Sequence, residues 1–149
     1  YTRPLDGQRD LRALVGRHEG PDVSVAAPAT PVLLPAETAR QFAAAVASAV
    51  DNVREHCPEG TRVWLLLEDE GDAVQVSVRD DGPGFAPDRL ATAAAEGRLG
   101  VAQSIRGRIR ELGGTAEVVS APGQGTEVEM RIPRVEKEVG AGGDARRGR

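Results

Sequence analysis

The sequence predicts a two-layer α+β sandwich, in which helices cover one face of a mainly antiparallel sheet. Two stretches, 61–79 and 115–132, each contain two strand-like segments around a polar or glycine-rich turn, which is typical of a β-hairpin. Two others, 35–57 and 99–112, repeat apolar residues at spacings of three and four and are long enough to cover such a sheet. We therefore expect the order strand, long helix, hairpin, loop, helix, hairpin.

The composition fits one folded domain and excludes several classes of protein. The 149 residues suit a single domain with tails, and a content of 40% hydrophobic but only 3% aromatic residues requires an aliphatic core. A net charge of −4 argues against a nucleic-acid-binding surface. The single cysteine, Cys57, excludes a disulfide within the chain and fits the cytoplasm. No apolar run approaches the roughly 20 residues of a membrane-spanning helix, so we expect no direct membrane contact.

Three segments are distinguished along the chain. Residues 1–20 are polar with a short helical pattern, and we expect a linker there. Residues 21–134 hold the domain, which begins with a short strand at 23–25. Residues 135–149 combine charges and glycines without a pattern, which predicts a disordered tail. Because the chain starts with tyrosine instead of methionine, we expect a piece of a longer protein.

The helix predicted over 35–57 carries the clearest apolar stripe. Pro35 suits the first turn of a helix, and Pro58 helps to end it. A polar row with a spacing of four runs beside the stripe. At about 100° per residue, Asn52 in this row lies roughly 90° from the middle of the stripe, so it borders the core. The stripe consists of Phe42, Ala45, Val46, Ala49, Val50 and Val53, and the polar row of Ser48, Asn52 and His56.

The second helix and the segment before it are less regular. Residues 86–98 are alanine-rich and weakly patterned, and we expect a mobile loop with about one helical turn. The helix predicted over 99–112 is ended by Gly113 and the glycine after it. The last strand, 126–132, alternates apolar and polar residues, which predicts one buried face.

The run 80–84, Asp-Asp-Gly-Pro-Gly, is the strongest candidate for a binding site. It directly follows the predicted strand 73–79, so the pleat fixes the direction of the Asp80 side chain. A carboxylate there can accept a hydrogen bond from an exocyclic amine, and Gly82 and Gly84 let a flat ring and its sugar approach the backbone. This combination suits adenine. The alternative is an ordinary turn, because Asp-Gly and Pro-Gly are common turn dipeptides.

Two further candidate groups lie on the predicted helices. The amide oxygen of Asn52 can coordinate Mg²⁺; the alternative is an exposed Asn52 with His56 as a cation favoured by the helix C-terminus. The run 97–100, Gly-Arg-Leu-Gly, precedes the second helix, whose free N–H groups and dipole favour phosphate. Arg98 adds positive charge to this site, and the alternative is a flexible loop before a helix.

Together, these motifs resemble the ATP-binding catalytic domain of bacterial sensor histidine kinases, in the superfamily of gyrase B, heat-shock chaperones and mismatch-repair ATPases. The resemblance spans about residues 20–134 and is carried by the runs 51–56, 80–84, 97–100 and 113–133. The short lid and the Arg-x-Arg pattern of the second helix are most similar to the nitrate-sensor-type subfamily.

The resemblance implies a Bergerat fold, with a mixed sheet covered by helices, that binds ATP and Mg²⁺ beneath a lid. Asp80 would accept from the adenine amine, Asn52 would hold Mg²⁺ against the phosphates, and the glycines of 97–100 would let the lid close. The chemistry would be in-line transfer of the γ-phosphoryl group. The residues implied in nucleotide binding are Asn52, His56, Asp80, Gly82, Gly84, Gly97, Arg98 and Gly100, with Asn52 as the metal ligand.

Two positions depart from the pattern of the superfamily. Ser48 stands where an acidic residue, often called the general base, is usual, so no catalytic residue is assigned. Glu55 stands where a basic residue is common, with Arg54 one position earlier. These departures keep open the alternative of a non-catalytic nucleotide-binding regulatory module. A further alternative is an anti-sigma-type serine kinase of the same fold, although the glycine-box details favour the histidine kinases.

We expect the phosphoacceptor of this kinase to lie outside the chain. In the family it is a histidine on a dimerising helical hairpin, and neither His18 nor His56 lies in a matching context. The partners implied are that dimerisation domain of the same protein and a downstream response regulator. We expect the segment to be monomeric, to bind ATP and to need the hairpin for autophosphorylation. The stimulus and any membrane anchor of the parent protein are not indicated.

Overall fold

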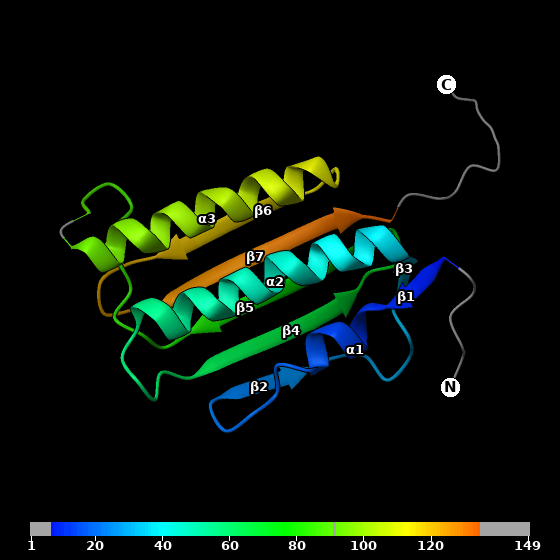
Figure 1. Cartoon of the computed structure of the whole chain (residues 1–149), viewed down its shortest axis with the longest axis horizontal. Coiled ribbons are helices and arrows are strands. Elements are labelled where there is room, and N and C mark those ends of the chain that lie inside the picture. Colours follow the sequence, from blue (N-terminus) through cyan, green and yellow to red (C-terminus); the bar gives the residue numbers. More distant parts are fainter. Residues whose placement is uncertain (1–6, 91, 135–149) are drawn as a thin grey trace.

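The computed structural model describes residues 7–90 and 92–134, so the tail predicted at 135–149 lies outside the described residues. The strands of the central sheet, in spatial order, are β2 (Val23–Ala26), β4 (Val63–Asp69), β5 (Ala73–Asp80), β7 (Thr126–Pro133) and β6 (Thr115–Ser120) (Figure 1). β2 runs parallel to β4, and the other neighbouring strands are antiparallel. The mixed, mainly antiparallel sheet is confirmed.

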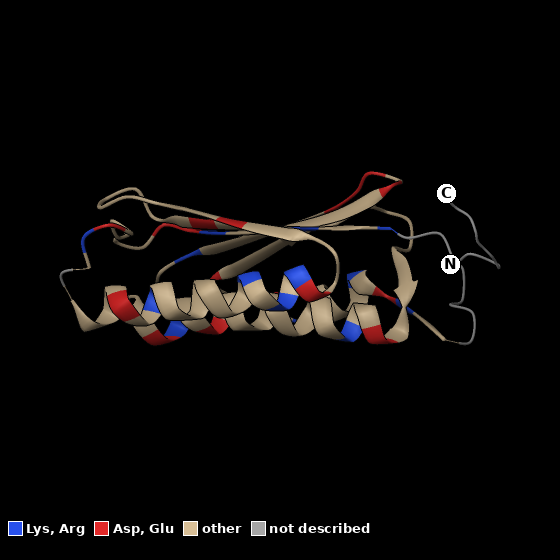
Figure 2. Ribbon diagram, turned by 90° about the horizontal axis from the view of Figure 1, so that it is seen from above, with Lys and Arg blue, Asp and Glu red and all other residues tan. Residues whose placement is uncertain are grey.

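Two long helices, α2 (Ala36–His56) and α3 (Ala93–Glu111), lie side by side on one face of this sheet (Figure 1, Figure 2). α2 buries the predicted apolar stripe, with Phe42 and Val46 at the centre of the core. The helices thus form the second layer of the predicted sandwich. Within residues 7–90 and 92–134, no helix is both long enough and apolar enough to cross a membrane.

The alternation of the strands determines which side chains enter the core between the two layers. In β4, Val63 and Leu65 are buried, whereas Trp64 between them is exposed on the other face. β5 is flanked by β4 and β7, and the register pairs its last residue, Asp80, with Val63 on one side and Thr126 on the other. The end of β5 is therefore fixed from both sides.

Residues 8–16, which lie in the segment 1–20 predicted as a linker, contribute to the folded unit. β1 (Gln8–Asp10) pairs with β3 (Leu33–Pro35) in a separate two-stranded sheet. The following helix, α1 (Leu11–Gly16), buries its apolar side in the common core. Strands of three residues are too short to show a period of two, which is why the sequence did not indicate them.

α3 begins at Ala93, six residues before the helix start predicted at Leu99. The Thr92 hydroxyl caps the helix by accepting a hydrogen bond from the N–H of Ala95 at 3.0 Å. The alanines that follow Thr92 favour a helix intrinsically, although they show no apolar period. The predicted loop over 86–98 is therefore wrong for its last six residues, which are helical.

Asp10 ties the N-terminal elements together. Its Oδ1 accepts hydrogen bonds from the N–H groups of Arg12 and Val32, each at 3.0 Å, and its Oδ2 lies 2.9 Å from Nη2 of Arg12. Burial alone would raise the pKa of Asp10. The hydrogen bonds and the Arg12 charge outweigh burial and hold the pKa of this carboxyl below its usual value.

Asp10→Ala is expected to lower the free energy of unfolding by about 2 kcal/mol at neutral pH, because a helix cap and the partner of a buried N–H are lost. The pKa of Asp10 is lower in the folded than in the unfolded state. Its contribution is therefore present above the unfolded pKa and is lost as the pH falls through the folded pKa. In urea denaturation, the difference in the free energy of unfolding between wild type and Asp10→Ala should decrease toward about pH 3.

The control for this prediction is Asp51→Ala, which removes an exposed carboxylate on α2. It should change the free energy of unfolding by less than about 1 kcal/mol at either pH. A gap between wild type and Asp10→Ala that persists unchanged in acid would contradict the role given to the Asp10 carboxylate.

Candidate functional site

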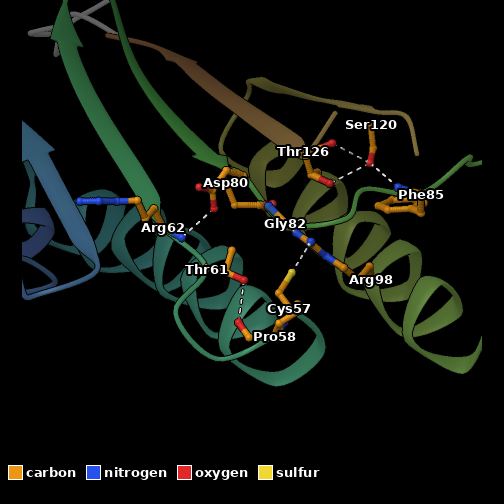
Figure 3. Close-up of polar contacts among 12 residues, drawn as sticks. Cys57, Pro58, Thr61, Arg62, Asp80, Gly82, Phe85, Arg98, Ser120 and Thr126 are labelled. Carbon is orange, nitrogen blue, oxygen red and sulfur yellow. Dashed lines mark hydrogen bonds and ion pairs between the residues drawn. The ribbon is translucent and has the colours of Figure 1, made fainter. Parts of the chain in front are cut away.

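The predicted site lies where the end of β5 meets the last turn of α2 and the first turns of α3 (Figure 3). Asp80 is 3% exposed. Its Oδ1 accepts a hydrogen bond from the N–H of Gly82 at 2.9 Å, and its Oδ2 accepts one from Nη2 of Arg98 at 2.9 Å. The neighbouring Asp81 is exposed and accepts from the N–H of Arg62 at 2.8 Å. Of the two carboxylates, Asp80 is the buried one, as its position at the strand end predicts.

The two glycines after Asp80 lie in close packing with other elements. A Cβ at Gly82 would lie 2.8 Å from Sγ of Cys57, and a Cβ at Gly84 would lie 2.1 Å from the carbonyl oxygen of Ala121. Gly84 also has a φ of +69°, in the left-handed region that favours glycine. Both positions need the absence of a side chain, and in this structure their close neighbours are protein atoms.

Asn52 lies in the second half of α2 with its side chain buried. The residue is 5% exposed, and its Oδ1 has no hydrogen-bond partner among the described residues. Leaving a buried acceptor unpaired costs about 1–3 kcal/mol. This oxygen is therefore a free acceptor that a cation or a donor group can use, and the prediction that Asn52 borders the core is confirmed.

The end of α2 and the start of α3 meet at His56 and Gly97. A Cβ at Gly97 would lie 2.5 Å from Cε1 of His56, so the missing side chain lets the imidazole approach the backbone of α3. His56 is half-buried, one helical turn after Asn52. His56 thus lies on the same ridge of α2 as the free oxygen, as the polar row predicts.

The prediction that the run 97–100 precedes a helix and offers free N–H groups is wrong. Both of its glycines lie within α3, beyond its first turn, because the N–H of Glu96 already donates to the carbonyl oxygen of Thr92 at 3.0 Å. The two glycines also differ from each other. Gly97 contacts His56, whereas a Cβ at Gly100 would have no heavy atom within 4 Å. A site for phosphate at a helix start around Gly97 is therefore not formed in this structure.

Arg98 lies inside α3 and not before the start of a helix, where the sequence predicts it. The residue is 5% exposed, and its guanidinium lies between Asp80 and Cys57, with Nη1 donating to Sγ of Cys57 at 2.9 Å (Figure 3). The guanidinium carbon lies 6.0 Å from the centre of the Phe85 ring. The early start of α3 explains this placement, because it fixes Arg98 on the helix side that faces the end of β5.

Sequence reasoning missed Thr126 and Cys57. Thr126 is buried, pairs with Asp80 in the sheet register, and its hydroxyl lies 2.7 Å from Oγ of Ser120. Aligning the two hairpins of the sheet would have placed it beside Asp80. Cys57 had no pattern that indicated a role. Burial raises the pKa of the Cys57 thiol, so it meets Arg98 as a neutral acceptor at neutral pH.

Gly97→Ala and Gly100→Ala form a matched pair of variants on α3. Gly100→Ala is expected to raise the free energy of unfolding by about 0.5–1 kcal/mol, because alanine favours a helix and its Cβ meets open space. Gly97→Ala gains the same propensity but must displace the His56 ring, so it should be less stable than Gly100→Ala by about 1–2 kcal/mol. Thermal denaturation measures both. Equal shifts in the two variants would contradict the contact, and adding His56→Ala should remove the difference.

The fold and the site define a class of protein. Residues 37–136 match the model of the family described as histidine kinase-, DNA gyrase B- and HSP90-like ATPases, and the chain belongs to this family. The particular relatives are sensor kinases. Sensor histidine kinase LiaS of Bacillus subtilis is 33% identical over 95 residues, which cover 64% of this chain and 25% of LiaS. Sensor protein VraS of Staphylococcus epidermidis is 32% identical over 96 residues, 64% of this chain and 26% of VraS. The chain spans about a quarter of the length of these curated relatives.

Solved structures share the fold. The mycobacterial sensor histidine kinase MprB superposes with a TM-score of 0.59 at 20% identity, covering 85% of this chain and 95% of that one. The nucleotide-free catalytic domain of histidine kinase ThkA gives a TM-score of 0.64 at 18% identity, covering 85% and 94%. At these identities the likeness concerns the fold alone. The nitrate-sensor-type subfamily stays a prediction.

Proposed function

We propose that this chain is the ATP-binding catalytic domain of a bacterial sensor histidine kinase, which donates the γ-phosphoryl group of ATP to a histidine on a separate dimerisation domain. The observation that carries the proposal is the buried Asp80 carboxylate at the end of β5, held by the N–H of Gly82 at 2.9 Å. The identity with LiaS and VraS supports the choice of a sensor kinase within the ATPase family. The chain would need the dimerisation domain to complete autophosphorylation.

Asp80 would recognise the adenine amino group of the nucleotide. Because Oδ1 accepts from the N–H of Gly82, the carboxylate is held in one orientation, and Oδ2, which accepts from Arg98 in this structure, would be the oxygen offered to an exocyclic amine. Hydrogen bonds to a charged acceptor are stronger than neutral ones, and they gain further in a buried setting. Gly82 and Gly84, whose positions admit no side chain, would border the ring.

Asn52 would hold Mg²⁺ through its unpaired Oδ1, since an amide carbonyl oxygen is a suitable ligand for this ion. His56 and Gly97 would keep the ends of α2 and α3 together beside it. When bound, Mg²⁺-ATP supplies the γ-phosphoryl group for in-line transfer and part of the charge compensation. The contribution of this chain would be to position and shield the nucleotide.

The half-buried Ser48, one helical turn before Asn52, favours a histidine as the acceptor. A hydroxyl acceptor or a water must lose a proton to attack phosphorus, and an acidic residue at this position could take it. A neutral imidazole, with an ordinary pKa near 6.5, already presents a free lone pair at neutral pH. Transfer to histidine therefore does not require a base from this chain, which makes the serine kinase the weaker alternative.

The test supplies this chain with the phosphoacceptor domain of its own full-length protein and with Mg²⁺ and γ-labelled ATP. We expect transfer that gives an acid-labile, alkali-stable phosphoramidate on the acceptor, and none when the acceptor histidine is replaced by glutamine. An acid-stable phosphoserine product would establish the serine kinase instead. Tight Mg²⁺-ATP binding without any transfer would establish the non-catalytic module. A response regulator added afterwards should remove the labelled phosphoryl group from the acceptor. We propose that the reaction takes place in the cytoplasm.

A further inference from the structure

Arg98 already occupies the carboxylate oxygen that the proposed nucleotide would use. Its Nη2 lies 2.9 Å from Oδ2 of Asp80, and both side chains are almost completely buried. A guanidinium N–H and an adenine amino N–H are the same kind of donor, and both suit a carboxylate acceptor. The other oxygen, Oδ1, accepts from the N–H of Gly82 at 2.9 Å.

We propose that Arg98 is an internal ligand of the adenine site, which adenine must displace from Asp80, so that this arginine sets the affinity of the protein for adenine nucleotides. The inference rests on the proposed function. It assigns Arg98 a role opposite in sign to that of a phosphate ligand, because removal of a competitor strengthens binding whereas removal of a phosphate ligand weakens it.

The contacts of Arg98 suit a side chain that exchanges its partner. A guanidinium has five N–H donors, but the hydrogen bonds found for Arg98 among the described residues are one to Asp80 and one to the sulfur of Cys57, beside the contact with the Phe85 ring. Its Nε is buried without an acceptor among these residues. A thiol sulfur is a weak acceptor, so only one of these contacts is strong.

A second arginine–aspartate pair of the described chain, between the half-buried Arg12 and the buried Asp10, provides a comparison. Arg12 grips Asp10 with both Nε and Nη2, at 3.1 and 2.9 Å from Oδ2, and its Nη1 donates to the carbonyl oxygen of Ala29 at 2.8 Å. Nε also lies 3.3 Å from Oδ1, so the guanidinium contacts both carboxylate oxygens, and such a bidentate contact adds energy and geometric specificity to the pair. Arg98 makes a single hydrogen bond to Asp80, from Nη2 to Oδ2, while the second oxygen accepts from the N–H of Gly82. The difference points to a pair that can open.

The surroundings of the site agree with an occupied pocket. Three hollows border it, with volumes of about 450, 420 and 410 Å³, and their linings include Cys57, Phe85 and Gly82, respectively. Asp80 and Asn52 line none of the three. The guanidinium, together with Cys57 and Gly82, fills the space in front of the carboxylate (Figure 3). Adenine can reach Oδ2 of Asp80 only when the Arg98 side chain has left.

The effect on affinity follows from the population of the open state. When a site is competent in only a fraction of the molecules, the apparent dissociation constant rises by the inverse of that fraction. If the Arg98–Asp80 pair is closed about 90% of the time, binding is weakened about tenfold. Removal of Arg98 should therefore increase the affinity about tenfold for any ligand that carries adenine. A ligand with phosphates should gain less if the released guanidinium then meets them.

The test titrates adenosine and ADP, without Mg²⁺, into the wild-type chain and Arg98→Ala in a calorimeter. We expect Arg98→Ala to bind adenosine about tenfold more tightly than wild type, with a smaller gain for ADP. The matched control is Arg110→Ala, an exposed arginine in the last turn of α3, which should leave both affinities unchanged. Unchanged or weaker adenosine binding by Arg98→Ala would overturn the inference.

A measurement on the wild-type chain covers the case in which Arg98→Ala does not fold. The ¹⁵N signals of the Arg98 guanidinium, assigned with Arg98→Lys, should shift and broaden when adenosine saturates the site. Signals that stay unchanged at saturation would overturn the inference. Failure of the proposed function is distinguishable: in that case neither wild type nor any variant takes up ADP or ATP, whereas uptake that does not move Arg98 removes the inference alone.

Discussion

Asp80→Asn is expected to weaken ADP binding by at least about 100-fold, because a charge-assisted hydrogen bond to a buried ligand is lost and an amide N–H can face the adenine amine instead. Calorimetric titration of ADP in the presence of Mg²⁺ measures the loss. The matched control is Asp81→Asn, because the adjacent carboxylate is exposed and accepts from the backbone N–H of Arg62 instead of facing the site. Its ADP affinity should stay within about twofold of wild type.

The same substitution should also destabilise the free protein, because the buried guanidinium of Arg98 loses its counter-charge. Removal of one partner from a buried ion pair typically costs about 3–5 kcal/mol. A lower free energy of unfolding could by itself reduce binding, so the double variant Asp80→Asn/Arg98→Gln is needed. With both charges removed, it should recover most of the stability of wild type in urea denaturation and still fail to bind ADP.

The double variant separates the two roles of Asp80. Recovered stability without ADP binding would assign the loss of binding to recognition of the nucleotide. ADP binding close to the wild-type level in the stable double variant would show that Asp80 does not contact the nucleotide, and the proposed site would then be wrong.

The parts of the fold that were predicted correctly depend on local patterns. The stripe on α2 repeats every three or four residues, and the position of Asp80 follows from the end of an alternating strand. Both features are encoded within about twenty neighbouring residues, so they can be predicted without knowledge of the tertiary structure. The start of α3 was missed for the same reason, because its alanines carry intrinsic helix propensity but no periodic apolar signal.

The partner of Arg98 could not be predicted from local pattern. Asp80 lies 18 residues before it in the chain and Cys57 lies 41 residues before it. The pair forms only because α3 packs against α2 over the end of β5. A sequence pattern identified a charged residue next to glycines, and the most general chemistry of such a residue is phosphate binding. Tertiary packing instead places Arg98 in a buried ion pair with Asp80. The titration of adenosine into Arg98→Ala tests the consequence of this pair for nucleotide binding.

Gly125→Ala is expected to cause a large loss of stability. Gly125 has a φ of +73°, and a Cβ on it would lie 2.1 Å from the backbone carbonyl oxygen of Asp80. The overlap is with backbone, so it cannot be relieved by rotating a side chain. β7 would have to move away from β5 at the Asp80–Thr126 pair. We expect the free energy of unfolding to fall by at least about 3 kcal/mol in urea denaturation.

The neighbouring Gly123 provides the matched control for this substitution. It has a φ of +77° in the same turn, but a Cβ on it would meet no heavy atom within 4 Å. Gly123→Ala therefore carries only the cost of a left-handed backbone, about 1 kcal/mol. The overlap at Gly125 also acts on the residue whose carboxylate would bind adenine. Gly125→Ala should thus lose ADP affinity in the molecules that still fold, whereas Gly123→Ala should keep it. Equal losses of stability in the two variants would show that the cost comes from the left-handed backbone of this turn and not from contact with Asp80.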